Sequence, residues 1–271
     1  MMYTERAASD DRVPRVKVMG TRPSPLIPAV IMIGGLAEEN QDQRWEWNLD
    51  QPSSKHGPHV AYGLGVQPLL ANYTVTMSFD WPAVRGVLKT TRQEAEAVLE
   101  LAKRHRIAPP YVLVGHSMGG KTALMARTMF NDDVIAAIVV DTAPWSYLNA
   151  PDAAPTPEYT AQHPSAAARV RAAMESWRLG HFKLAELATD RCVHCHVDVV
   201  PYDAPKEIQQ KGRRKIAETE RSFCQVTRHF GAGHTIMVTD PRVIVADVLR
   251  YVQPHYQRKH FNRRPLHRPR T

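Results

Sequence analysis

The sequence predicts an α/β protein with a mostly parallel central sheet and helices on both faces. Continuous apolar, β-branched runs such as Ala29–Ile33 and Val134–Val140 have the composition of strands that are buried on both faces. Segments with helical spacing separate these runs, as parallel strands require, because each must be reached by a crossover. A chain of 271 residues, 43% of them hydrophobic, is long enough to bury such a core in one domain.

The first part of this domain follows a polar segment, residues 1–15, that we expect to be disordered. Val16–Met19 is predicted as an early strand and Ala29–Ile33 as a buried one. Residues 37–71 show no clear periodicity, so we expect a loop there, folded over the entrance of a site. Tyr73–Asp80 has the composition of a further strand.

The middle of the chain has the most regular pattern. Thr91–His105 carries an apolar stripe at helical spacing. A strand starting at Tyr111 leads into a helix at Gly119–Phe130, and Val134–Val140 follows as another strand. This order predicts two parallel neighbours in the sheet.

Residues 145–190 differ in composition from their surroundings. Prolines break up the first part, and helices are predicted at Ala166–Trp177 and His181–Ala188. We expect a helical cap inserted above the sheet, with a plain surface insertion as the alternative.

The domain is expected to end at residue 253. Its last elements are predicted as a strand at His194–Val200, a helix at Lys206–Glu220, a strand at Cys224–His229 and an amphipathic helix at Asp240–Val252.

The positive charge is concentrated beyond this domain. The net charge is +8, and residues 254–271 contain six of the excess positive charges and no acidic residue. We expect this tail to be a solvated, disordered extension, with contact to anionic surfaces such as acidic lipid or nucleic acid as the alternative. The rest of the chain carries too little charge to predict a nucleic-acid partner.

A serine between glycines lies at the centre of the expected sheet. Gly115-His116-Ser117-Met118-Gly119 matches the G-x-S-x-G pattern, with a strand before it and a helix directly after it. Such a sharp turn strains the serine backbone and leaves no room for side chains two positions away on either side. The pattern predicts a raised, nucleophilic Ser117, with the first amides of the helix aimed at a developing negative charge.

Three motifs together resemble the α/β-hydrolase superfamily: the serine turn extended to Gly120-Lys121, Val140-Asp141-Thr142-Ala143-Pro144, and Gly231-Ala232-Gly233-His234. Within it the chain looks like YbfF-type esterases and their mitochondrial abhydrolase relatives. The resemblance covers about residues 28–253. It implies a serine esterase or thioesterase that acts on small acyl substrates, without a metal or organic cofactor.

The resemblance also implies roles for individual residues. Ser117 would be the nucleophile and His234 the base. The backbone amides of Leu36 and Met118 would form the oxyanion hole. The acid would be Asp141, as in the esterase group, while the general pattern of the superfamily favours a carboxylate after the next strand, where Asp198 or Asp203 could serve.

A second motif lies at residues 192–196. Cys192-Val193-His194-Cys195-His196 matches the C-x-x-C-H pattern of haem attachment, and zinc could also be bound there with Cys224 or His229. We interpret the motif as a packing feature, since no export signal is visible.

Two other functions remain open from the sequence. These are a non-catalytic binding protein with a hydrolase fold and an acyltransferase that uses the same residues. The longest apolar run is too short to span a membrane, so we expect a soluble, intracellular protein, most simply cytoplasmic, with a mitochondrial location implied only by the resemblance.

Overall fold

The structure is a computed structural model that describes residues 16–22, 24–35, 65–79, 90–142, 157–162, 171, 190–201 and 203–253. The segment expected to be disordered at 1–15, the basic tail at 254–271 and the cap helices predicted between 166 and 188 lie outside these residues, apart from Arg171.

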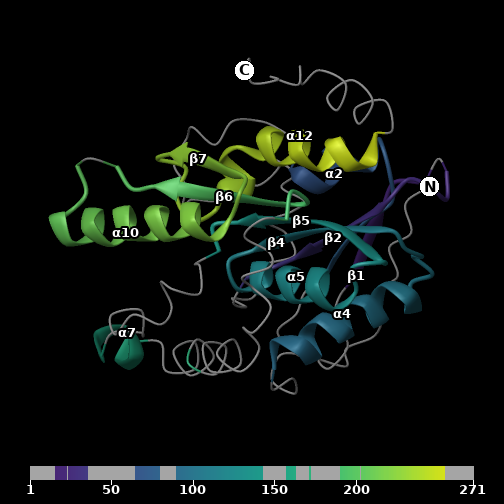
Figure 1. The fold of residues 1–271 in the computed structure, drawn as a ribbon, viewed down its shortest axis with the longest axis horizontal. Coiled ribbons are helices and arrows are strands. Elements are labelled where there is room, and N and C mark those ends of the chain that lie inside the picture. Colours follow the sequence, from purple (N-terminus) through teal and green to yellow (C-terminus); the bar gives the residue numbers. More distant parts are fainter. Residues whose placement is uncertain are drawn as a thin grey trace, which may run out of the picture.

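Seven strands form one sheet in the order β1-β3-β2-β4-β5-β6-β7 (Figure 1). Only the edge strand β1 is antiparallel to its neighbour, and the other pairs are parallel, as predicted. The strands are β1 (Val16–Met19), β2 (Ala29–Ile33), β3 (Thr76–Phe79), β4 (Tyr111–His116), β5 (Val134–Val140), β6 (Val193–Val199) and β7 (Val226–Phe230).

Helices cover both faces of the sheet (Figure 1). One face carries α2 (Val66–Ala71), α11 (Ile236–Thr239) and α12 (Pro241–Val252), and the other carries α4 (Thr91–Arg104), α5 (Met118–Met129) and α10 (Lys206–Ser222). A short helix, α7 (Pro157–Gln162), lies away from the sheet. The α/β class predicted from the sequence is thus confirmed.

The two hydrophobic cores follow from strand alternation. In β2, Ile31 and Ile33 pack toward α4 and α5, whereas Val30 and Met32 pack toward α2 and α12. All five residues of this strand are buried. A strand covered on both faces therefore needs the continuous apolar run seen in the sequence.

The predicted strand at Tyr73–Asp80 is too long. The observed β3 begins at Thr76, because the chain before it turns: Thr74 Oγ1 donates to the Pro28 carbonyl at 2.7 Å, and Tyr73 is exposed. Asp80 lies outside the described residues.

Three short helices, α2, α7 and α11, were not predicted. α2 lies in the segment expected to be a loop and buries Val66 and Leu70 beside α12. α7 begins at Pro157, which the sequence analysis treated as a breaker although proline is favoured at the first helical position. Helices of four to six residues are too short to show a helical period, so their sequences carry no signal for one.

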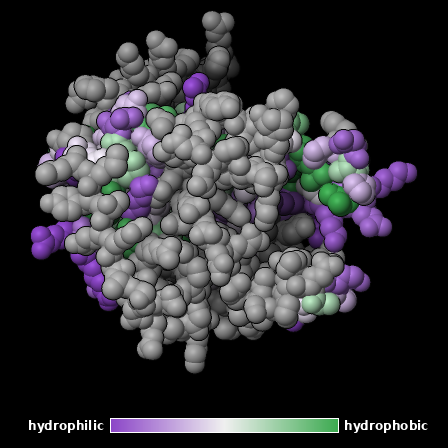
Figure 2. Space-filling model, turned by 180° about the vertical axis from the view of Figure 1, so that it is seen from behind, coloured by the Kyte–Doolittle hydropathy of each residue, from purple (hydrophilic) through white to green (hydrophobic). Residues whose placement is uncertain are grey.

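In the rear view, coloured hydrophilic residues lie at both sides of the molecule, and hydrophobic ones appear in small patches beside them (Figure 2). Among the described residues, none of the helices combines the length and apolar character needed to cross a membrane.

The start of α5 approaches the end of β2 without any gap. A Cβ atom at Gly119 would overlap the carbonyl oxygens of Ile33 and Gly34, which are backbone atoms with little freedom to move. We predict that Gly119→Ala lowers the free energy of unfolding by about 1–3 kcal/mol or more, measured by urea denaturation. The control Gly231→Ala has open space around the added methyl and only a positive φ of 70°, so it should cost less. Equal costs for both variants would contradict the packing argument.

Candidate active site

Ser117 occupies a strained turn between β4 and α5. Its φ of 53° and ψ of −117° lie outside the favoured regions for a residue with a side chain. The Ser117 amide donates to the Val140 carbonyl at 2.9 Å, and the Thr142 hydroxyl donates to the Ser117 carbonyl at 3.0 Å. The turn is therefore tied to the end of β5, which holds it in the strained geometry.

Asp141 follows β5 directly and is 4% exposed. Its Oδ2 lies 2.6 Å from His234 Nδ1, and its Oδ1 lies 2.6 Å from Lys215 Nζ and accepts the Asp198 amide at 3.1 Å. Burial alone would raise the pKa of this carboxyl, but the bonds from His234 and Lys215 outweigh burial and hold the pKa well below its usual range. Asp141 is therefore a buried carboxylate.

His234 lies in the loop between β7 and α11, with its side chain 55% exposed. Because a carboxylate can only accept, His234 Nδ1 carries the proton that points at Asp141. In the neutral ring, Nε2 then has a free lone pair, as a general base requires. The loop is shaped by Gly231 and Gly233, both with positive φ, and the Gly233 amide donates to Asp198 at 2.9 Å.

His116, which precedes the serine, holds the same loop from the other side. Its Nε2 donates to the His234 carbonyl at 2.7 Å, and the two ring centroids are 4.6 Å apart. The strained turn and the His234 loop are therefore in direct contact.

The structure brings Ser117, Asp141 and His234 to the carboxyl ends of β4, β5 and β7, where ligands bind in parallel sheets. Asp203 is exposed beyond β6, and the carboxylate bonded to His234 is Asp141. Met118 is the first residue of α5, so its amide has no acceptor within the helix.

The predicted oxyanion residue Leu36 lies outside the described residues. Its neighbour Gly35 is described and lies against the turn, since an added Cβ would sit 3.1 Å from Ser117 Cβ.

Two functional neighbours were missed by the sequence analysis: Lys215 and His116. Asp198, an alternative acid in that analysis, instead donates its amide to Asp141 and accepts the Gly233 amide. Lys215 belongs to a helix rich in charges, where nothing in the pattern distinguishes one lysine from another. His116 could have been suspected from its position inside the G-x-S-x-G motif.

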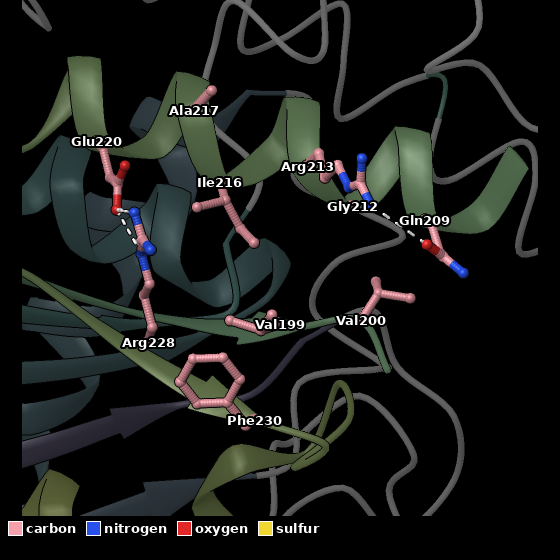
Figure 3. Close-up of a pocket in the computed structure, with 10 residues that line it drawn as sticks. All are labelled: Val199, Val200, Gln209, Gly212, Arg213, Ile216, Ala217, Glu220, Arg228 and Phe230. Carbon is pink, nitrogen blue, oxygen red and sulfur yellow. Dashed lines mark hydrogen bonds and ion pairs between the residues drawn. The ribbon is translucent and has the colours of Figure 1, made fainter. Parts of the chain in front are cut away.

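A groove of about 380 Å³ lies between α10 and the strands β6 and β7 (Figure 3). Its lining includes the Glu220–Arg228 ion pair and the exposed Phe230, but none of Ser117, Asp141 and His234. The candidate active site, formed by Ser117, Asp141 and His234, is therefore separate from this groove.

The C-x-x-C-H motif does not converge on one site. Cys195 is buried in the core on the α5 side of the sheet, where burial raises the pKa of its thiol, whereas His194 and His196 project toward α12. Cys224 is exposed and donates to the Asp190 carbonyl. Cys195 therefore lies on the face of β6 opposite to His194 and His196, while Cys192, before β6, packs beside the α12 core.

Comparison with known proteins gives one family match. A model of the Alpha/beta hydrolase family matches residues 30–248. A search of curated proteins by sequence found no match.

Solved structures share the fold at low sequence identity. The chain is similar to AqdC, a protein that cleaves the ring of the Pseudomonas quinolone signal (TM-score 0.57, 15% identity, 88% of this chain and 96% of that chain covered). It is similar to a putative lipase from Acinetobacter baumannii (0.55, 12%, 97% and 93%). It is also similar to an α/β hydrolase enzyme from the metagenome of Mar Chica lagoon sediments (0.51, 13%, 96% and 100%).

The buried charge of Asp141 predicts a loss of stability in acid. The unfolded chain takes up a proton at this residue as the pH falls through the ordinary value of 3.8, whereas the folded chain resists protonation. The free energy of unfolding should therefore fall below about pH 4, by up to ~1.4 kcal/mol per pH unit from this group.

Urea denaturation between pH 6 and pH 3 measures this slope. Asp141→Asn should flatten it, while Asp132→Asn, the same change at an exposed aspartate, should leave it unchanged. Parallel curves for wild type and Asp141→Asn would show that the carboxylate is not held ionised.

Proposed function

Because the chain belongs to the alpha/beta hydrolase family, we propose that it is a serine hydrolase that cleaves a carboxylic ester or thioester through a covalent acyl-enzyme. The observation that carries this proposal is the 2.6 Å hydrogen bond from His234 to the buried Asp141, at the sheet edge that also holds the strained Ser117. The finer relation to YbfF-type esterases and their mitochondrial relatives belongs to the same proposal.

In the proposed mechanism, Ser117 Oγ attacks the substrate carbonyl and His234 Nε2 takes its proton. The leaving alcohol or thiol receives that proton, and an acyl group remains on Ser117. Water, activated by the same nitrogen, then releases the acid. The amides of Met118 and Leu36 would stabilise the negative charge on the carbonyl oxygen.

Asp141 acts as the acid in this proposal, in preference to Asp203. It fixes the proton on Nδ1 and stabilises the imidazolium that forms when Nε2 takes up a second proton. Lys215 is a positioning residue: it contacts Asp141 Oδ1 and leaves Oδ2 to His234, so each oxygen has its own cationic or donor partner.

The fold alone does not identify the reaction. A protein described as a putative lipase and a ring-cleaving protein share it at 12% and 15% identity, so the reaction must be argued from the side chains. Transfer of the acyl group to a nucleophile other than water would use the same residues, and a binding protein with this fold would need none of them.

Substitution of the nucleophile tests the proposal. We expect the wild type to hydrolyse p-nitrophenyl esters of at least one acyl chain length, and Ser117→Ala to lose at least ~10³-fold in kcat. Circular dichroism should show that the variant is folded. The control Ser222→Ala, at the end of α10, should keep the wild-type rate.

Labelling gives a second readout. A fluorophosphonate should modify one equivalent of the wild type, on the peptide that contains Ser117, and should not label Ser117→Ala at that position. Equal background rates in wild type and Ser117→Ala, with no labelling, would reject the enzyme and favour the binding protein.

A further inference from the structure

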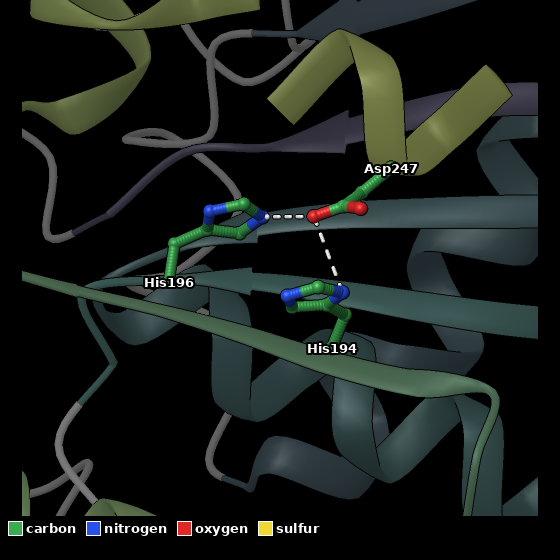
Figure 4. Close-up of side chains that lie close together, drawn as sticks. All are labelled: His194, His196 and Asp247. Carbon is green, nitrogen blue, oxygen red and sulfur yellow. Dashed lines mark ion pairs between the residues drawn. The ribbon is translucent and has the colours of Figure 1, made fainter. Parts of the chain in front are cut away.

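A second group of polar side chains lies under α12, on the face of β6 and β7 that packs against this helix. On the same face the central strands present aliphatic side chains, including Ile138 and Val140 of β5. In β6 the neighbouring positions are His194 and His196, and both are buried. Asp247 of α12 points into this polar patch and is also buried (Figure 4).

The three side chains meet at one carboxylate oxygen. His194 Nδ1 and His196 Nε2 each lie 3.1 Å from Asp247 Oδ2 (Figure 4). One ligand atom of each of these three residues lies within 4.8 Å of the other two. Ligand atoms bound to a tetrahedral zinc ion at its usual bond lengths are separated by roughly 3.3 Å, which is close to the two separations from Asp247 Oδ2.

The other nitrogen of each imidazole has a partner that would hold it for metal binding. His194 Nε2 lies 2.8 Å from the Thr227 hydroxyl, and His196 Nδ1 lies 3.0 Å from His229 Nε2. His229 Nδ1 in turn lies 3.2 Å from Asp240 Oδ2. Metal-binding histidines generally donate their second N–H to such groups, which fixes the ring and its tautomer.

One nitrogen of His196 is buried without a hydrogen bond. His196 Nε2 is fully buried and, within the part of the chain that the structure describes, has no hydrogen-bond partner, although Asp247 Oδ2 is only 3.1 Å away. The distance is short but the direction is wrong for a hydrogen bond. A buried nitrogen of this kind is costly unless something else fills the position.

We propose that His194, His196 and Asp247 bind one divalent transition-metal ion, and we name Zn²⁺ as the ion because two imidazoles and a carboxylate suit it. Arg250 occupies Asp247 Oδ1 at 2.9 Å, which leaves Oδ2 for the ion. This site departs from the expectation of no metal, and it uses none of the cysteines of the C-x-x-C-H motif.

Such an ion would join β6 to α12 beside the candidate active site. The His196 carbonyl accepts the Asp141 amide at 2.8 Å, and α12 follows the loop that carries His234. The ion would therefore be structural, with its main effect on the stability of this edge of the domain.

Metal titration of the whole chain tests this site. After removal of metal with a chelator, we expect the wild type to bind one tight equivalent of Zn²⁺ in competition with a chromophoric chelator and to gain thermal stability on binding. Asp247→Asn should lose at least ~100-fold in affinity, and His229→Gln, which removes the imidazole partner of His196, about 10–100-fold. The control His105→Gln changes an exposed histidine and should bind as the wild type does.

Cobalt gives a readout that needs no variant. Co²⁺ bound to the wild type should show the visible absorption of a low-symmetry site, and X-ray absorption should show nitrogen and oxygen ligands, including imidazole, and no sulfur. Failure of the wild type to bind a tight equivalent, unchanged affinity in Asp247→Asn, or sulfur among the ligands would each overturn the proposal. Loss of esterase activity in Ser117→Ala would leave this test unaffected.

Discussion

The hydrogen bond between Asp141 and His234 joins two loops that are 93 residues apart in the chain, and the candidate active site depends on it. The carboxylate is almost fully buried, so it stays charged only while donors surround it. Lys215, the Asp198 amide and His234 supply them from three separate segments. The same contacts that keep Asp141 ionised therefore place the imidazole.

The parallel sheet makes this convergence possible. Adjacent parallel strands end at the same edge, so Ser117 after β4 and Asp141 after β5 are neighbours without long loops. Both have positive φ, which costs energy in each case. Hydrogen bonds between the two turns, from the Ser117 amide and the Thr142 hydroxyl, hold these conformations in place.

The sequence predicts the features that are local and leaves open those that depend on contacts between residues far apart in the chain. The strand, glycines and helix around Ser117 can be recognised because they are consecutive, and the buried strands because both of their faces are apolar. Asp141 and Asp203 cannot be separated by pattern, since each follows a predicted strand and only the folded chain decides which one His234 contacts. Lys215 is hidden for the same reason, because its partner lies 74 residues away.

The C-x-x-C-H motif shows how local spacing can mislead. Successive side chains of a strand point to opposite faces, so Cys195 and His196 cannot share a site in β6. His194 and His196, two positions apart, do share a face. Their carboxylate partner comes from α12, more than 50 residues later, so no motif could include it.

The account depends most on Asp141 and His234 acting as a unit, and a double-mutant cycle on esterase kcat/KM tests this directly. We expect Asp141→Asn and His234→Gln each to reduce kcat/KM strongly, and the double variant to be little worse than His234→Gln alone, because the aspartate acts through the imidazole. If the two losses simply multiplied, the residues would act independently, and the proposed pairing would be contradicted.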